Sequence, residues 1–395
     1  MQPRTEQQPE VKAVGVQVDQ SEYKASQRRY KRLANLRLRN FDTIVLSGHG
    51  CFVKIRDDAL VVEYQRPGEQ GNDRLLRLNR GTHKIKQIIL LAHSGYISFS
   101  AIEWATQQNV VIIMLTYDGE LLQVLTPHRQ PRSAKLCYLQ FKAGESDLCI
   151  EIARELVRRK TLAQIEVLKA LSERRSGEAV PLDSGKRILV DTSQGRVSAS
   201  SACQFLEDGL VELSLRRTIG TIQSVEGRLA SYYWQSFVGL PILWDRKSSK
   251  SIPAHWLFVT ERVSGMSGYL NAHRANNPFH ACLNFCYSLL QADVLRAIHV
   301  ANLEPNIAFL HLNSEQHHSL VFDLMEPFRP IVDAMVLAFF QKITFSKSDF
   351  YQEITGEVRM SEMLRRHILA SCRVNPVEID QVVRWLRSTL EGGPV

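Results

Sequence analysis

The sequence predicts an α+β protein, in which an N-terminal, mostly β domain precedes a larger helical domain. Short β-rich runs separated by turn signals occupy residues 41–126. Beyond residue 136 the apolar residues recur at a spacing of about 3.6, which is typical of amphipathic helices. The chain has 395 residues, more than the roughly 250–300 at which one hydrophobic core stops growing, so we expect two domains.

Composition places the chain among ordinary globular proteins with an excess of positive charge. Hydrophobic residues make up 44% and charged residues 23% of the sequence, and the formal net charge is +8. Such an excess favours a polyanionic partner such as nucleic acid. The N-terminus lacks an apolar signal region, and no apolar run approaches the roughly 18 residues of a membrane helix. We therefore expect a cytoplasmic protein that does not contact membranes.

Seven scattered cysteines favour buried free thiols over disulfides or a zinc site. Cys282 and Cys286 lie four residues apart within an apolar helical pattern. A zinc site would need a second tight pair, and the sequence contains none.

Residues 1–40 are predicted to be a polar and basic extension. Residues 24–39 contain seven Lys or Arg and no acidic residue. Two interpretations remain open, a solvated helix or flexible arm and an extension that binds DNA phosphates.

The region 41–126 is predicted to form a β-rich domain. The runs TIVLS, CFVKI and ALVVEY are separated by turn signals at 47–50 and at Asp57-Asp58. Two later runs flank Tyr117-Asp118-Gly119, where Asp-Gly favours the type I′ turn of a hairpin. The segment 98–108 predicts a short helix capped by a serine.

A linker at 127–136, which contains two prolines, leads into a helical domain at 137–392. Apolar residues at 148, 152, 156, 162, 165 and 168 predict one long helix, and residues 174–200 are expected to form a loop. Further helices are predicted near 203–216, 222–238, 278–301, 331–342 and 376–391.

Three places in the helical region carry candidate chemistry. Glu226 lies on an amphipathic helix, and His311 closes an apolar run. Asp323 and Glu326 are three residues apart, so one helical turn would place both carboxylates on one face. They lie in an apolar stretch, where an ionised carboxylate must be paired or must bind a metal. Oxygen ligands with one imidazole suit Mg²⁺ or Mn²⁺ better than a closed zinc site.

Each candidate also has a simpler explanation. A lone helical Glu such as Glu226 is usually a solvated surface residue, and a histidine after an apolar run is often a packing residue. Arg329 could form a structural ion pair with the nearby acids. If a metal does bind, contact with a phosphodiester would let it polarise the phosphoryl oxygen, and the positive charge of the chain would serve the substrate backbone.

An ordered set of motifs sharpens this interpretation. The set resembles the family of CRISPR-associated endonucleases and integrases, the larger subunit of the spacer-acquisition module. The resemblance extends from about residue 43 to about residue 365. It rests on the segments VEGRLASYYW, HWLFVTER, NNPFHACLNFCYSLL, NLEPNIAFLH and SLVFDLMEPFRPIVD.

The resemblance implies a site and an activity. Glu226, His311 and Glu326 would bind one divalent metal ion, Mg²⁺ or Mn²⁺, and Asp323 would lie beside it as a further catalytic residue. The β domain would form a homodimer and the helical domain would be catalytic. Two dimers bridged by a small second adaptation subunit would form a heterohexamer that inserts double-stranded DNA fragments into a CRISPR array. Arg262, Asn284 and Arg329 are the residues that we expect to contact substrate; each could instead be an ordinary packing residue.

Two positions depart from the family pattern. His280 stands where the family often has Asn, and Ala308 stands where Gly is usual. Neither change removes an expected ligand, although both affect expected substrate contacts. Two other functions remain open, a transposase of the related mobile-element lineage and a non-catalytic scaffold that binds DNA.

Overall fold

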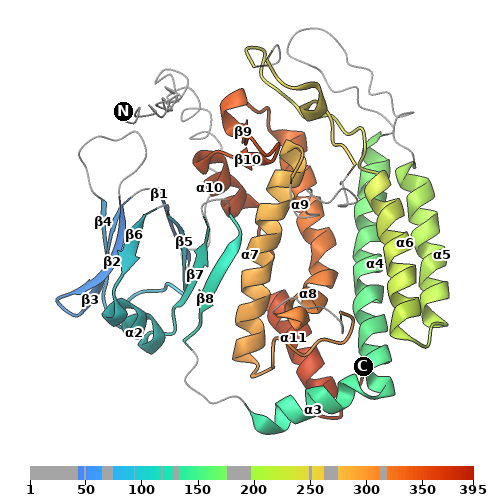
Figure 1. The fold of residues 1–395 in the computed structure, drawn as a ribbon, viewed down its shortest axis with the longest axis horizontal. Helices are drawn as coiled ribbons and strands as arrows, with labels where there is room; N and C mark the ends of the chain where they lie inside the picture. The colour runs from blue at the N-terminus through green and yellow to red at the C-terminus, as the bar shows by residue number, and fades with distance from the viewer. Residues whose placement is uncertain are drawn as a thin grey trace, which may run out of the picture. The chain divides into compact units, whose positions relative to one another are not determined.

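All five predicted β-rich runs form strands, in a computed structural model that describes residues 43–48, 50–64, 74–92, 94–116, 119–127, 133–175, 197–248, 251–261, 275–311 and 318–395. Two four-stranded sheets build the N-terminal part, with strand orders β1-β5-β7-β8 and β4-β3-β2-β6 (Figure 1). The strands are β1 (Thr43–Gly48), β2 (Cys51–Arg56), β3 (Ala59–Tyr64), β4 (Arg74–Leu78), β5 (Gln87–Ala92), β6 (Gly95–Ile97), β7 (Val111–Leu115) and β8 (Leu121–Leu125).

Local turn chemistry explains how these strands are connected. Asp57 and Asp58 join β2 to β3 with φ values of 49° and 57°, the positive values that a two-residue type I′ turn requires. Strands β7 and β8 pair antiparallel as predicted, and Gly119 has a φ of 91° in their connection. The expected type I′ turn there involves Tyr117-Asp118, which lies outside the described residues.

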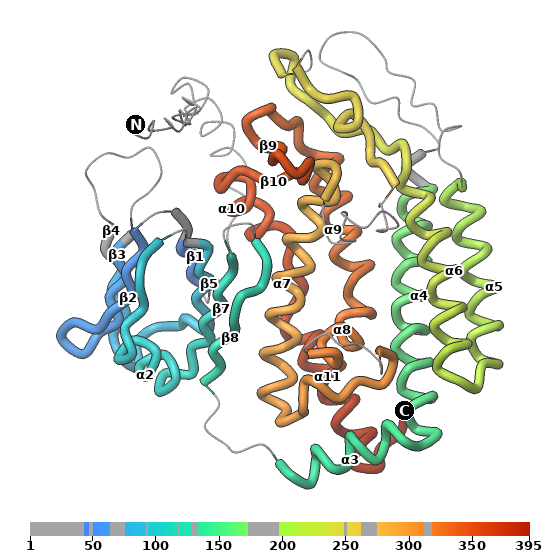
Figure 2. Tube along the Cα trace, in the orientation of Figure 1, coloured from blue at the N-terminus to red at the C-terminus, as the bar shows by residue number. Residues whose placement is uncertain are grey.

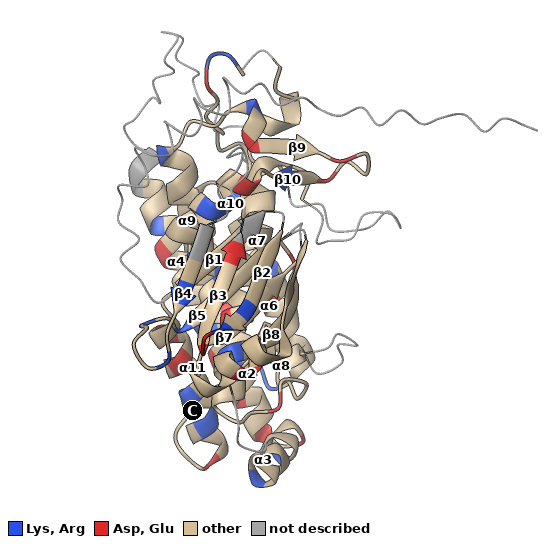
Figure 3. Cartoon of the chain, turned by 90° about the vertical axis from the view of Figure 1, so that its left-hand side faces the viewer, with Lys and Arg blue, Asp and Glu red and all other residues tan. Residues whose placement is uncertain are grey.

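A hydrophobic core joins the two sheets to one short helix. Helix α2 (Phe99–Gln107) begins at Ser98, whose side chain accepts a hydrogen bond from the backbone of Ala101, as its serine cap predicted. Trp104 of this helix is fully buried among strand residues such as Leu60 and Ile88. The strands themselves carry few charged side chains (Figure 3).

The rest of the chain is mostly helical, so the predicted fold class is confirmed. The trace in Figure 2 shows α4, α5 and α6 side by side, in agreement with their packing contacts. The helices are α3 (Ala134–Gly144), α4 (Asp147–Arg175), α5 (Ala199–Ser214), α6 (Ile219–Gln235), η2 (Ala254–Trp256), α7 (Pro278–Val300), α8 (Ser319–Met325), η3 (Glu326–Phe328), α9 (Arg329–Lys342), η4 (Lys347–Asp349), α10 (Glu362–Ser371) and α11 (Pro376–Leu390).

Sequence periodicity did not predict the short helices α3, α8 and α10 or a short antiparallel pair, and α3 begins within the predicted linker 127–136. Strands β9 (Phe350–Gln352) and β10 (Val358–Met360) have only three residues each, too few for a period of two to be visible. Their aromatic residue Phe350 packs edge-on against Trp244 and Trp256, which attaches the hairpin to the segment after α6.

Proline placement explains the break between α8 and α9. Pro327 cannot donate a backbone hydrogen bond, and the chain forms the 3-10 turn η3 there before it continues as α9, with Pro330 in its first turn. The helical chain is therefore interrupted between Glu326 and Phe328.

The close approach of α5 to α6 depends on one glycine. A Cβ atom at Gly209 would lie 2.3 Å from Cδ2 of Leu229, which is far inside van der Waals contact. The missing side chain lets α6 pack tightly, with Leu229 buried against α5. Helix α6 also carries Glu226, so this contact fixes one side of the candidate site.

Several predictions fall partly or wholly outside the described residues. These include the basic segment 24–39 and most of the expected loop 174–200, although α4 extends to Arg175 and α5 begins at Ala199. All seven cysteines are free, and five of them are buried: Cys51, Cys149, Cys282, Cys286 and Cys372. Within the described ranges, no helix has the length and apolar character needed to cross a membrane.

We predict that replacing the cap of α7 destabilises the protein more than replacing the cap of α11. Asn277 is fully buried, accepts a bond from the backbone of His280 and donates to Thr260. Asn375 caps α11 at an exposed position. N277A should lower the free energy of unfolding by about 2 kcal/mol and N375A by about 0.5–1 kcal/mol. Urea denaturation measures both, and equal losses would contradict the prediction.

Candidate functional site

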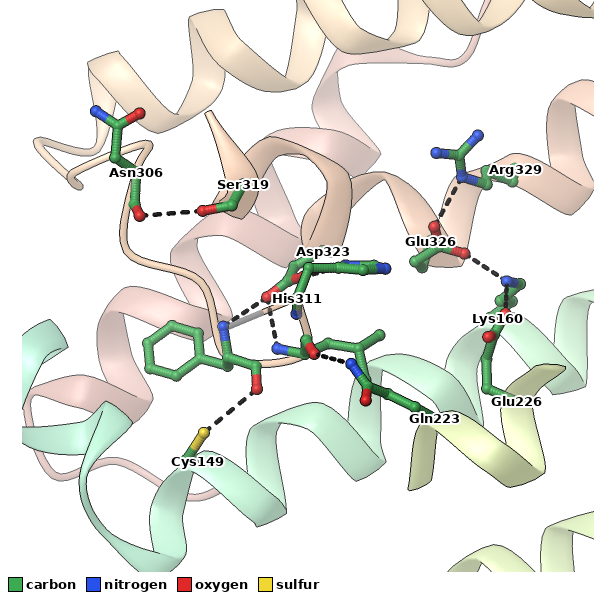
Figure 4. Close-up of polar contacts among 12 residues, drawn as sticks. Cys149, Lys160, Gln223, Glu226, Asn306, His311, Ser319, Asp323, Glu326 and Arg329 are labelled. Carbon is green, nitrogen blue, oxygen red and sulfur yellow. Dashed lines mark hydrogen bonds and ion pairs between the residues drawn. The ribbon is translucent and has the colours of Figure 1, made fainter. Parts of the chain in front are cut away.

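A buried lysine links two of the predicted site residues. Lys160 of α4 donates a hydrogen bond to Oε1 of Glu226 on α6, and its ammonium lies 2.5 Å from Oε2 of Glu326 in η3. Figure 4 shows the lysine between the two carboxylates. Only 8% of Lys160 and 6% of Glu326 is exposed, so the pairing takes place away from bulk water.

Glu326 is held between two cations. Arg329 donates from Nε to Oε1 of Glu326 at 2.8 Å, while Lys160 faces the other oxygen. Burial alone would raise the pKa of Glu326, but the charges of Lys160 and Arg329 outweigh it and lower the pKa to about 2. Burial likewise opposes the charge of Lys160, yet Glu326 and Glu226 raise its pKa on balance. Glu326, Lys160 and Arg329 are therefore charged at neutral pH.

His311 is oriented by Asp323 rather than by the other acids. The Asp323 carboxylate, which is completely buried, accepts the His311 Nδ1–H at 2.6 Å. The same carboxylate accepts the backbone N–H groups of Phe309, Leu310 and His311 at 2.6, 2.8 and 3.1 Å. Because a carboxylate can only accept, this contact places the imidazole proton on Nδ1 and leaves Nε2 as the nitrogen with a lone pair in a neutral ring.

Two further contacts fix the segment that carries His311. Gln223, one turn before Glu226 on α6, donates from its amide to the carbonyl of Leu310 at 2.7 Å. The thiol of Cys149 on α4 donates to the carbonyl of Phe309 at 3.3 Å. Helices α4 and α6 therefore position both Glu226 and the His311 segment (Figure 4).

The three expected ligands lie near one another without forming a closed ligand cluster. The hydrogen bond from Asp323 raises the pKa of His311 against the effect of burial, and the charges of Glu326 and Glu226 raise it further. In the part of the chain that the structure describes, no three Asp, Glu, His or Cys side chains are arranged as ligands of one ion. Lys160 instead supplies the cation between the two glutamates.

The remaining predicted residues are less directly connected. Arg329 contacts Glu326, so the expected structural ion pair is present. Asn284 lies on α7, where its carbonyl accepts a bond from Ser288, and its substrate role stays a prediction. Arg262 lies outside the described residues. His280, one of the two departures, is buried and bonds through Nε2 to the carbonyl of Thr260.

Sequence reasoning missed Lys160 and Gln223. Lys160 continues the apolar series 148, 152 and 156 at the same spacing of four, and a lysine within an apolar stripe is a signal for a buried ion pair. Gln223 gives no such signal, because an exposed glutamine in the first turns of a helix is ordinary.

Comparison with known proteins identifies one family over most of the chain. The model described as "CRISPR associated protein Cas1" matches residues 44–373. A curated relative from Archaeoglobus fulgidus, named CRISPR-associated endonuclease Cas1 1, is 26% identical over 329 residues, which is 83% of this chain and 86% of that protein.

Solved structures share the fold. A casposase bound to integration product has a TM-score of 0.69 at 24% identity, with 88% of this chain and 90% of that chain covered. A CAS1 protein from Thermotoga maritima has a TM-score of 0.64 at 16% identity, with 89% and 98% covered. The chain of a Cas6-RT-Cas1–Cas2 complex has a TM-score of 0.61 at 14% identity, with 88% and 35% covered.

We predict that K160M lowers the free energy of unfolding by about 3–5 kcal/mol, because it leaves two neighbouring carboxylates without their shared cation. The pKa of Glu326 lies below its ordinary value of 4.5 in the folded state, so its contribution is fully present above pH 4.5 and is lost as pH falls toward 2. The difference in the free energy of unfolding between K160M and the wild type should therefore shrink as pH falls from 4.5 toward 2.

Denaturation at several pH values tests this, with K169M as the control. Lys169 is also on α4 and pairs with Glu166 and Glu207, but these side chains are exposed. K169M should unfold as the wild type does. A K160M protein as stable as K169M at pH 7 would show that the ion pairs of Lys160 with Glu226 and Glu326 do not hold α4, α6 and η3 together.

Proposed function

The chain belongs to the CRISPR-associated Cas1 family, and we propose that it is a divalent-metal-dependent DNA endonuclease and integrase that inserts new spacers into a CRISPR array. One observation carries the proposal. Glu226 and Glu326, from segments 100 residues apart, face the same buried cation within the region that the family model matches. Two carboxylates beside an imidazole nitrogen form a donor set suited to metal-assisted phosphodiester chemistry.

The residues present fit Mg²⁺ or Mn²⁺. Oε2 of Glu326 is buried and lies 2.5 Å from the Lys160 ammonium, so the surroundings of this oxygen already hold a positive charge. Glu226, His311 and Glu326 would hold the ion through two carboxylates and one imidazole, donors that hard divalent cations accept. When bound, the metal would polarise the phosphoryl oxygen of the strand under attack.

The other side chains of the site would support that chemistry. Asp323 holds the proton of His311 on Nδ1, which leaves Nε2 as the ring nitrogen that would bind the metal. Lys160 and Arg329 would offset negative charge that gathers on the phosphoryl group during transesterification. The 3′-hydroxyl of an incoming DNA fragment would attack a phosphorus of the repeat strand, and the 3′ oxygen of that strand would leave as the new P–O bond forms, so no covalent enzyme intermediate is required.

We further propose that the chain acts on double-stranded DNA as a homodimer, joined by a small second adaptation subunit in a heterohexamer. The similarity to a chain of a Cas6-RT-Cas1–Cas2 complex supports a second subunit. The similarity to a casposase bound to integration product supports integration as the reaction. The similarity to that casposase makes a transposase the second candidate function. The family model and the endonuclease names of the curated relatives favour spacer acquisition.

We predict that strand transfer depends on the three candidate ligands. E226A, H311A and E326A should each lower the rate of fragment insertion into supercoiled plasmid DNA by a factor of at least about 1,000, since each removes a metal donor. K169M is the control, because Lys169 is exposed on α4 and pairs with the exposed Glu166 and Glu207, and it should retain most of its activity. Insertion is measured with and without the small second subunit.

An E226A protein that inserts fragments at the wild-type rate would reject the site. A wild type that binds DNA but inserts no fragment under any divalent metal would favour the scaffold function instead. Insertion only of the DNA ends that flank its own gene, and not of other fragments, would favour the transposase.

We predict that Mn²⁺ binding is lost as the solution becomes mildly acidic. Asp323 raises the pKa of His311 above 6.5, and only the neutral imidazole can bind metal, so affinity should fall with a midpoint above pH 6.5. D323N removes the main cause of the raised pKa and should move the midpoint to lower pH. Calorimetric titrations between pH 5 and 8 measure this, and an identical midpoint in both proteins would contradict the role of Asp323.

A further inference from the structure

A second buried carboxylate lies in α9, outside the contacts of Lys160. Only 2% of Asp333 is exposed, and a buried carboxylate needs hydrogen-bond donors. Tyr233 of α6 donates its hydroxyl to Oδ2 at 3.0 Å, and Tyr287 of α7 donates its hydroxyl to Oδ1. One side chain therefore joins three helices.

Through Tyr233, Asp333 is connected to the helix that carries Glu226. Tyr233 follows Glu226 by seven residues on α6, which is close to two helical turns, so the two side chains leave the helix on nearly the same face. Tyr233 is completely buried. Its bond to Asp333 opposes rotation of α6 about its axis, and such a rotation would carry Glu226 away from Lys160.

Through Tyr287 and Arg329, Asp333 is connected to Glu326. The guanidinium of Arg329 lies 4.9 Å from the centre of the Tyr287 ring, a distance at which the ring attracts a cation. The same guanidinium donates to Oε1 of Glu326 at 2.8 Å. The bond between Tyr287 and Asp333 holds the ring in place beneath Arg329 and thereby supports the orientation of Glu326.

We propose that Asp333 is a positioning residue that sets the orientation of both metal-binding carboxylates, through Tyr233 for Glu226 and through Tyr287 and Arg329 for Glu326. The proposal rests on the function proposed above. Positioning of this kind changes metal affinity, because a carboxylate displaced by a fraction of an ångström loses its contact with the ion.

The protein offers a matched control for a purely structural role. Asp293 of α7 is buried to a similar degree, with 1% exposed, and accepts two bonds from Arg373 at 2.6 and 3.2 Å. Arg373 also donates to Thr43 of β1. This carboxylate fastens α7 to the first strand and, in the described part of the chain, bonds to Arg373 and not to Lys160, Glu226 or Glu326.

The experiment compares full-length D333N, Y233F, Y287F and D293N by calorimetric titration with Mn²⁺, with thermal melting of each protein alongside. D333N should weaken Mn²⁺ binding about tenfold or more, and each tyrosine variant should weaken it by less. D293N should lower the melting temperature and leave the affinity for Mn²⁺ unchanged. Where D333N does not fold, Y233F and Y287F carry the test, since each removes a single hydrogen bond.

Variants of Asp333, Tyr233 and Tyr287 that bind Mn²⁺ as the wild type does would overturn the positioning role, whatever their melting temperatures. A wild type that binds no Mn²⁺ would reject the proposed function instead. Positioning is then decided by a crystal structure of Y287F. Displaced contacts between Lys160 and the two glutamates would support it, and unchanged contacts would overturn it.

Discussion

The arrangement of the helical region depends on one interaction, the pairing of the Lys160 ammonium with Glu226 and Glu326. Two carboxylates that approach each other away from water repel, and burial of either one alone costs several kcal/mol. A shared cation reverses both effects, and Arg329 supplies a second positive charge on the outer side of Glu326. The spacing of α4, α6 and η3 is therefore set by charge compensation as well as by apolar packing.

The two acids of one helical turn serve different purposes for a structural reason. Asp323 accepts bonds from the backbone and imidazole of His311, while Glu326 faces cations. A completely buried carboxylate with four N–H donors is well satisfied and has little capacity left for a metal. Asp323 is thus suited to orient a ligand, and Glu326 is suited to be one.

Local sequence patterns predict much of this architecture. The apolar spacing of about 3.6 predicted α4, α6, α7 and α11 to within a few residues, because an amphipathic helix needs a continuous apolar face wherever it packs. The hairpin of β9 and β10 was not predicted, since three-residue strands are too short to show a period. The identities of Glu226, His311 and Glu326 came from the order of motifs, which single residues would not have supplied.

What the sequence by itself determined is the fold class, the positions of the longer helices and of five strands, and the residue types available for chemistry, because these depend on contacts within a few turns of chain. The tertiary structure alone decided which side chains meet. Lys160 lies 66 residues before Glu226, and Tyr233 lies 100 residues before Asp333. Such pairs form only when helices far apart in sequence pack together, and nothing in the local pattern of either partner encodes the distance, the burial or the charge of the other.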